Sequence, residues 1–196
     1  FFEKAGVAPD KIVGEVNYAI STAYLWNMIG AAVGMTLFTN VAKLGFNNVE
    51  FRKGDIEDMP VTSNKADVIV SNCVLNLVPN KHKVFSEIFR VLKPGGHFSI
   101  SDIVLEGQLP EKWKQVAELY AGCVSGAIQK EEYLGIIAET GFSNITLQKN
   151  KPILIPDDIL ANYLTQEEVT AYKNGTTKIT SITVYAEKPA KDDRNC

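Results

Sequence analysis

The feature that most constrains the fold of this sequence is a regular alternation of strand-like and helix-like segments from residue 49 onward. Residues 66–71 (ADVIVS) form a nearly continuous apolar run, which is typical of a strand buried on both faces. Apolar residues then recur at helical spacing after Asn80, which can cap a helix that starts near Lys81. We expect further strands at residues 49–51, 97–102, 144–149 and 179–187, and further helices at residues 110–123, 130–140 and 157–172. This alternation predicts an α/β fold with a mostly parallel sheet, an antiparallel edge strand, and helices on both faces.

Composition limits the classes of function that need considering. A chain of 196 residues and 21.6 kDa suits a single domain, residues 1–196, and 45% hydrophobic residues exclude a disordered chain. The net charge of −3 argues against nucleic acid as a partner, because binding to phosphates needs a positive surface. Three cysteines without regular close spacing exclude a disulfide framework and a CxxC zinc site. They suit a reducing compartment, so we expect a cytoplasmic protein.

Residues 16–42 carry no charged side chain, and the run is long enough to cross a bilayer. Several polar residues dilute it, and buried polar side chains are costly in lipid. The run also lacks the basic start and the small-residue cleavage site of a signal peptide. We therefore expect a core segment, or a segment assembled from pieces, and no membrane association.

Three motifs occur in a characteristic order: GDIEDMP at 54–60, ADVIVSN at 66–72 and RVLKPGG at 90–96. Together they resemble the class I methyltransferases that depend on S-adenosylmethionine (SAM), over residues 49–187. The resemblance implies a Rossmann-like sheet and SAM as cofactor. It also implies that residues 103–196 carry the substrate-side elements.

A narrower resemblance lies within the first. The segment SNCVLNLVPN at 71–80, followed by LYAGCVSGAI at 119–128, looks like the arsenite methyltransferases. The family carries one cysteine after its fourth strand and another in a later helix, and Cys73 and Cys123 fall at those places. The resemblance implies that both thiolates hold trivalent arsenic, a soft ion for which thiolate is the matching ligand.

Candidate cofactor residues follow the predicted strands. Ligands bind beyond the carboxyl ends of strands in an open parallel sheet, so Asp55, the pair Asn72 and Cys73, and Asp102 should converge on one crevice. By resemblance, Asp55 accepts a hydrogen bond from the adenine amino group and Ile56 packs on the ring. Residues 72–74 (Asn72, Cys73 and Val74) meet the methionine end. The alternatives remain open that Asp55 is a turn residue and that Cys73 is a small buried hydrophobe.

The sequence departs from the family at its N-terminal part, residues 1–48. The glycine-rich D-x-G-x-G-x-G loop is absent, and so is the acidic residue that ends the second strand. Two explanations stay open: ordered pieces of a longer chain joined end to end, or a genuine deletion of the cofactor loop. Under the first explanation, we expect a structure of these residues to contain no bound SAM.

The sequence thus predicts a SAM-dependent methyltransferase for trivalent arsenic, presented as arsenite or its thiol conjugate, with a thiol reductant. A first alternative is methyl transfer to a small organic acceptor such as a quinone, with both cysteines structural. A second is a non-catalytic homologue that binds arsenic or another soft metal. Cys196 is either incidental or a third thiol ligand, and the oligomeric state is left open.

Overall fold

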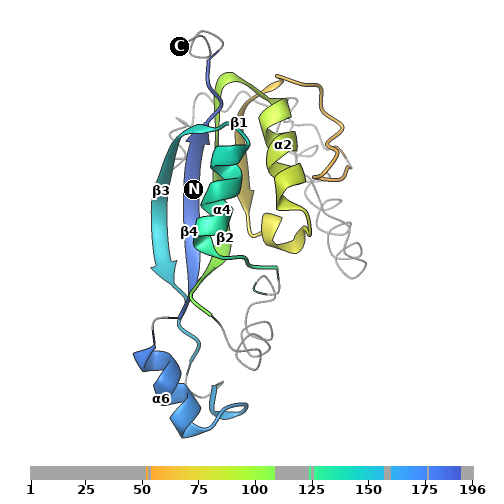
Figure 1. Ribbon diagram of the computed structural model, residues 1–196. Coiled ribbons are helices and arrows are strands. Elements are labelled where there is room, and N and C mark those ends of the chain that lie inside the picture. Colours follow the sequence, from red (N-terminus) through yellow and green to blue (C-terminus); the bar gives the residue numbers. More distant parts are fainter. Residues whose placement is uncertain are drawn as a thin grey trace, which may run out of the picture.

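The computed structural model describes residues 52, 54–108, 124, 126–156, 160–175 and 177–190 (Figure 1). The elements in this part of the chain are β1 (Ala66–Asn72), the 3-10 helix η3 (Leu75–Leu77), α2 (Lys81–Val91), β2 (Leu92–Glu106), α4 (Lys130–Glu139), β3 (Ser143–Pro152), α6 (Gln166–Asn174) and β4 (Lys178–Glu187). They confirm the strands expected from residues 66, 97, 144 and 179 and the helices expected from residues 81 and 130. The segments expected at 49–51 and 110–123, and the uncharged run at 16–42, lie outside the described residues.

The four described strands form one sheet in the order β1-β2-β4-β3. β1 pairs with β2 in parallel, whereas β4 is antiparallel to both of its neighbours, β2 and β3. The α/β class is confirmed, and the edge strand β3 pairs antiparallel with β4. The expectation of a mostly parallel sheet is not exact, because β1 with β2 is the one parallel pairing among the described strands. Side-chain chemistry explains the order: β4 is buried on both faces, whereas β3 is mostly exposed along its length.

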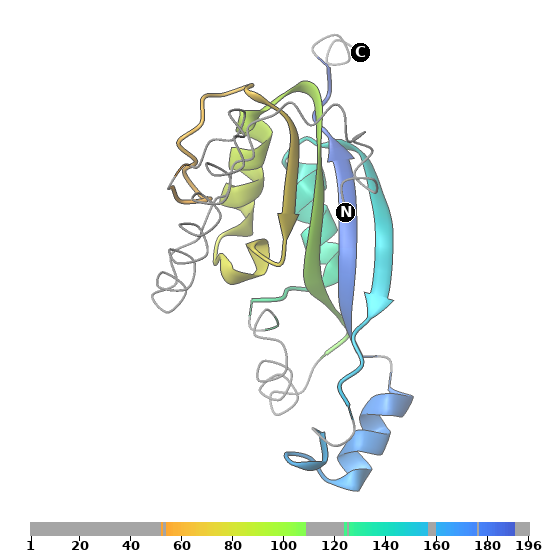
Figure 2. The same ribbon diagram turned by 180° about the vertical axis from the view of Figure 1, so that it is seen from behind.

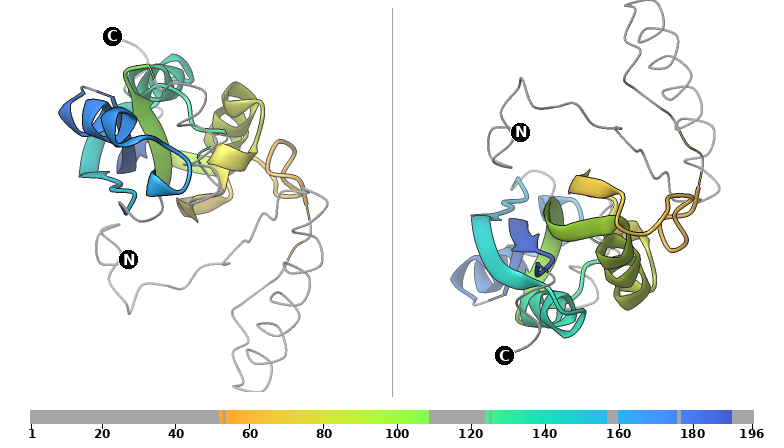
Figure 3. Two further views of the ribbon diagram at one scale, coloured as in Figure 1. Left: turned by 90° about the horizontal axis from the view of Figure 1, so that it is seen from below. Right: turned by 90° about the horizontal axis from the view of Figure 1, so that it is seen from above.

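Helices α2 and α4 pack side by side on one face of this sheet. Figure 1 shows both helices in front of the strands, and Figure 2 shows the same strands from behind, with both helices beyond them. The views along the strands in Figure 3 agree. The sequence predicts helices on both faces of the sheet. Among the described residues, helices cover this one face.

The main core fills the space between these helices and the sheet. α2 buries Val84, Phe85, Ile88 and Val91, which recur at the spacing of one helical face. Asn80 caps this helix as expected, since its Oδ1 accepts a hydrogen bond from the Lys83 N–H at 3.0 Å. Aromatic side chains join the layers through tilted and edge-to-face ring pairs with centroids 4.9–5.9 Å apart: Phe85–Tyr133, Phe85–Phe98, Phe98–Phe142 and Phe89–Phe142.

A second, smaller core lies where β2 and β4 extend beyond the end of β1. We call it the satellite core; its buried members are Ile103, Leu105, Val124, Ile155, Leu160, Leu164, Val169 and Ile179. Helix α6 contributes to it. The helix expected at residues 157–172 is interrupted: Leu160 and Ala161 are helical, residues 162–165 are not, and α6 begins at Gln166. The start is fixed by a capping box, in which Thr165 and Glu168 exchange hydrogen bonds between side chains and backbone N–H groups.

Lys188 joins the chain that follows β4 to the end of α2. Its buried ammonium donates hydrogen bonds to Phe89 O at 2.7 Å, Leu92 O at 2.8 Å and Asn64 Oδ1 at 2.8 Å. The nitrogen also lies 4.7 Å from the centre of the Phe89 ring. A cation at a helix C-terminus interacts favourably with the helix dipole, so Lys188 stabilises the junction of α2, β2 and β4.

Replacing Lys188 with Met should therefore destabilise the protein strongly. The variant keeps the length of the side chain but leaves buried acceptors without their donor, which should lower the free energy of unfolding by about 2–4 kcal/mol. Chemical denaturation measures this change. The control is Lys149→Met on exposed β3, which should stay within about 0.5 kcal/mol of wild type. Equal effects of the two substitutions would contradict the assigned role.

Candidate active site

The backbone at the end of β1 sets the position of Cys73. The last paired residue of β1, Asn72, lies opposite Ser101, and the Cys73 N–H then donates to Ser101 O at 2.7 Å. Cys73 has a backbone φ of 56°, in the left-handed region that residues other than glycine rarely adopt. Its thiol makes a long hydrogen bond to the exposed Asn72 Oδ1, at 3.8 Å. Val74 follows, partly buried against the main core.

The predicted adenine residues lie in a tight turn before β1. Asp55 is exposed; its Oδ1 accepts the Glu57 N–H at 2.9 Å and its carbonyl accepts the Asp58 N–H at 3.1 Å. Asp55 therefore has the turn role that its residue type favours. Its Oδ2 makes no hydrogen bond to the described residues, so it could still accept one from an amino group. Ile56 is only 6% exposed and belongs to the main core, which leaves little of it for packing on a ring.

The turn and Cys73 lie toward the same end of the sheet. The chain after Asp55 runs alongside α2 in the opposite direction: Glu57 pairs with Lys83 at 3.6 Å, and Met59 bonds to Glu87 further along the helix. Asp55 therefore lies toward the start of α2, which is the end that follows Cys73 through η3. Asp55 offers an exposed carboxylate and Asn72 an exposed amide, so this end of the sheet presents hydrogen-bond acceptors and donors to a polar ligand.

Asp102 does not line the crevice predicted at the end of the strands, because β2 continues to Glu106 and Asp102 lies within the strand. It faces the helices and is 1% exposed, and its Oδ2 accepts the Tyr133 hydroxyl at 2.8 Å. Lys81, also buried, lies within electrostatic reach and donates to Val78 O at 3.1 Å. The sequence did not single out Tyr133 or Lys81. The sequence feature that could have revealed this cluster is the carboxylate of Asp102, which stands at an inward position of an apolar strand.

The environment changes the proton affinity of this cluster. Burial raises the pKa of Asp102 to about 7, against the lowering effects of the Tyr133 hydrogen bond, Lys81 and the Asn76 backbone. Burial also raises the pKa of Tyr133, and the negative charges of Asp102 and Cys73 act in the same direction. The sulfur of Cys73 therefore lies within electrostatic reach of the Tyr133 phenol. Burial lowers the pKa of Lys81, while Asp102 and Glu132 oppose that change.

Cys123 lies outside the described residues, but two of its neighbours are described. Val124 is 1% exposed and packs in the satellite core. Gly126 passes so close to η3 that a Cβ added to it would lie 1.6 Å from Asn76 O. No side chain fits in that space, so glycine is needed for the close approach. The contact joins a residue three positions after Cys73 to a residue three positions after Cys123.

In the described parts of the chain, no three His, Cys, Asp or Glu side chains are grouped so that they could hold a metal ion. None of the helices seen in those parts is both long and apolar enough to cross a membrane.

Comparison with known proteins agrees with this architecture. The profile of the methyltransferase domain family matches residues 31–141, so the chain belongs to that family. It is a Rossmann-like class I methyltransferase in fold, and its sequence is close to the arsenite methyltransferases. It is 35% identical over 154 residues to the arsenite methyltransferase of Halobacterium salinarum, covering 79% of this chain and 37% of that protein. It is 39% identical over 125 residues to that of Aquipseudomonas alcaligenes, covering 62% and 36%.

A solved structure is also similar. The arsenic(III) S-adenosylmethionine methyltransferase of Chlamydomonas reinhardtii superposes with a TM-score of 0.66 at 26% identity, over 91% of this chain and 56% of that one. The chain thus spans little more than a third of the length of the two curated relatives and about half of this structure.

The buried acid predicts an unusual dependence of stability on pH. The folded state holds the Asp102 proton more tightly than the unfolded chain, whose carboxyl titrates at 3.8. This group therefore favours folding fully below about pH 4, and the advantage is lost as the pH rises toward 7. In Asp102→Asn the loss should disappear, so the stability of the variant relative to wild type should improve by on the order of 2–3 kcal/mol between pH 5 and pH 8.

Denaturation at several pH values measures this difference, and it does not depend on the absolute stability of the variant. Asp67→Asn is the control, because Asp67 is exposed and pairs with Lys93 on the surface. A difference between wild type and Asp102→Asn that stayed constant with pH would overturn the assignment.

Proposed function

We propose that the protein catalyses SAM-dependent methyl transfer to trivalent arsenic, with the thiolates of Cys73 and Cys123 holding the substrate. The observation that carries the proposal is the contact of Gly126 with Asn76 O, which joins the segments that follow the two cysteines. The burial of Val124 in the satellite core supports a fixed course for the chain next to Cys123. The similarity to arsenite methyltransferases supports arsenic as the acceptor.

Thiolates suit this substrate because arsenic(III) is soft and thiophilic. Cys73 is well placed for such a role: its left-handed backbone directs the residue away from the path of β1, and a rare conformation of this kind is often found at functional sites. The proposal requires both thiols in the reduced form, which a reducing cytoplasm maintains.

SAM supplies an electrophilic methyl group on a sulfonium. The lone pair of arsenic forms the new As–C bond as the S–C bond breaks, and S-adenosylhomocysteine leaves. Arsenic becomes formally pentavalent in this step, so a thiol reductant must return two electrons before another methylation. No proton needs to be removed, and the protein contributes chiefly by alignment of the reactants.

On the cofactor side, the proposal assigns the adenine amino group to Asp55, whose Oδ2 has no other partner among the described residues. Ile56 would border the ring with its small exposed part, and Asn72 and Val74 would border the methionine end.

The direct test is transfer of labelled methyl from SAM to arsenite, with excess glutathione, by the full-length protein. Wild type should form methylated arsenic. Cys73→Ser and Cys123→Ser should each reduce the rate about 100-fold or more, because misplaced reactants lose the benefit of alignment. Both variants should still bind S-adenosylhomocysteine in calorimetry. The control is Cys196→Ser, which should retain activity if that thiol is incidental.

Other outcomes would replace the proposal. Bound S-adenosylhomocysteine without arsenic methylation, together with activity on a quinone that survives Cys73→Ser, would indicate an organic acceptor. Arsenite binding without any affinity for S-adenosylhomocysteine would indicate a non-catalytic protein.

Cys73→Gly should separate stability from function. Glycine adopts a φ of 56° without the strain of a side chain, which offsets the greater freedom it gives the unfolded chain. The free energy of unfolding should therefore stay within about 1 kcal/mol of wild type while arsenic methylation is lost. The matched control is Asn144→Gly, at φ of 52° on β3, which should leave both properties near wild type. Retained methylation in Cys73→Gly would rule out Cys73 as an arsenic ligand.

A further inference from the structure

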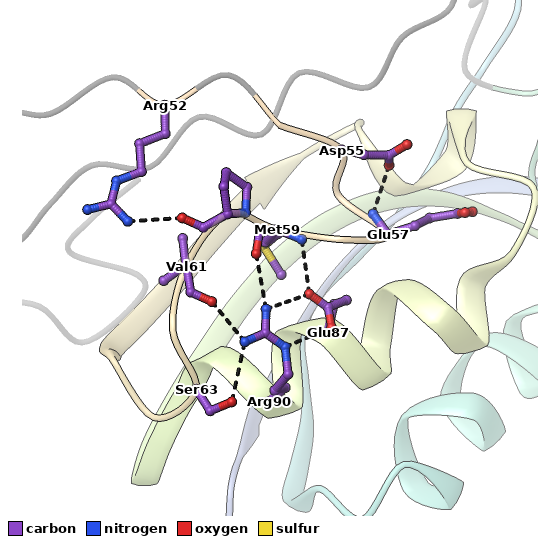
Figure 4. A network of polar contacts seen from close by, with 9 residues as sticks. Arg52, Asp55, Glu57, Met59, Val61, Ser63, Glu87 and Arg90 are labelled. Atoms are coloured by element: carbon purple, nitrogen blue, oxygen red, sulfur yellow. Dashed lines mark hydrogen bonds and ion pairs between the residues drawn. The ribbon is translucent and has the colours of Figure 1, made fainter.

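The ion pair of Glu87 with Arg90 on α2 binds the loop that follows Asp55. Residues 59–63 belong to no strand, so their backbone groups need partners from elsewhere. Glu87 and Arg90, on the outer side of α2, provide partners for Met59 and Val61, while Arg52 donates to Pro60 O at 3.0 Å (Figure 4). We call Glu87, Arg90 and the loop groups that they bind the Arg90 latch.

The latch is a dense set of hydrogen bonds. Arg90 binds Glu87 through two of them, from Nε to Oε1 at 2.8 Å and from Nη2 to Oε2 at 2.7 Å. Nη1 donates to Val61 O at 2.8 Å and to Ser63 Oγ at 3.3 Å, and Nη2 donates to Met59 O at 3.1 Å. Glu87 Oε2 in turn accepts the Met59 N–H at 3.0 Å. Both backbone polar groups of Met59 are therefore held by the same ion pair.

The geometry uses the whole guanidinium group. Its five N–H donors match the five hydrogen bonds, an arrangement that lysine could not reproduce. The side chains of Arg90 and Glu87 are 33% and 15% exposed, so the pair is partly shielded from solvent. The hydrogen bonds from Arg90 lower the pKa of Glu87, and Glu87 raises that of Arg90. The latch therefore stays charged over the whole physiological range of pH.

Other contacts carry the constraint from the latch toward Asp55. Gly54 packs against the Pro60 ring so closely that an added Cβ would lie 2.3 Å from its Cδ. Glu57 pairs with Lys83 on the same helix, but at 3.6 Å and with a lysine side chain that is 54% exposed. That pair is weaker than the latch, so Met59 is the nearest firmly held point after the turn.

We propose that Glu87 and Arg90 are positioning residues for SAM, acting through residues 59–63 to orient Asp55 toward the adenine. This inference rests on the proposed function in one respect, the assignment of Asp55 to the adenine amino group. It makes α2 the rigid support of the cofactor loop. Loss of the latch lowers cofactor affinity and leaves the thiol ligands of arsenic intact.

The test compares cofactor affinity with arsenite affinity in the full-length protein. Arg90→Ala and Arg90→Lys should each raise the Kd for S-adenosylhomocysteine about tenfold in calorimetry, because lysine keeps the charge but not the fork of donors. The Kd for arsenite should stay within about twofold of wild type. Amide hydrogen exchange at residues 55–63 should accelerate in both variants and slow again when S-adenosylhomocysteine is bound.

Lys93→Ala is the matched control, since it removes the exposed Lys93–Asp67 pair at 2.8 Å without touching the loop. Faster exchange without a change in the Kd for S-adenosylhomocysteine would show a purely structural latch and overturn the inference. An equal loss of affinity in Lys93→Ala would also overturn the inference, and so would a wild-type Kd for S-adenosylhomocysteine in Arg90→Lys. If wild type binds S-adenosylhomocysteine but does not methylate arsenite, the proposed acceptor fails while the latch can still be judged from the Kd. If wild type binds none, the inference fails as well.

Discussion

The parallel pairing of β1 with β2 is the constraint on which the site depends. It runs through Asn72 opposite Ser101 and ends with the hydrogen bond from the Cys73 N–H to Ser101 O. That last bond holds Cys73 where the chain leaves the sheet, and the turn there requires a left-handed residue. Because Cys73 bears a side chain, the fold accepts some backbone strain at this position. A glycine would remove the strain but also the thiol, so the conformation is more easily explained by function than by stability.

The two halves of the candidate site are supported by different parts of the molecule. The cofactor side depends on a loop fastened to α2, whereas the substrate side depends on the approach of Gly126 to Asn76 and on the burial of Val124 in the satellite core. Strand β2 joins the two, since its first part pairs with β1 and its extension packs in the satellite core. The extension of β2 beyond Asp102 carries Ile103 and Leu105 into the satellite core, and it explains why Asp102 lies inside the fold.

Local patterns in the sequence predicted much of this architecture. The cap at Asn80, the helix from Lys130 and the strands around residues 66 and 179 follow from side chains close together in the chain. The features that local patterns could not predict depend on residues far away in the chain. The depth of Asp102 depends on where β2 ends, and the partners of Arg90 lie about thirty residues earlier. The break before α6 is a local feature, because the capping box of Thr165 and Glu168 lies within four residues of sequence.

Helix α2 connects these observations. Its start follows η3 and holds Lys81 next to the buried carboxyl of Asp102, while its last turns hold the latch and end at the junction bound by Lys188. Rigid elements position catalytic groups better than loops do, and here one amphipathic helix supports two loops from its polar side and its ends. Its apolar face packs in the main core, which fixes the helix that both loops contact. In the proposed mechanism, the cofactor and the first thiol would both be positioned by this helix, as an in-line transfer between them requires.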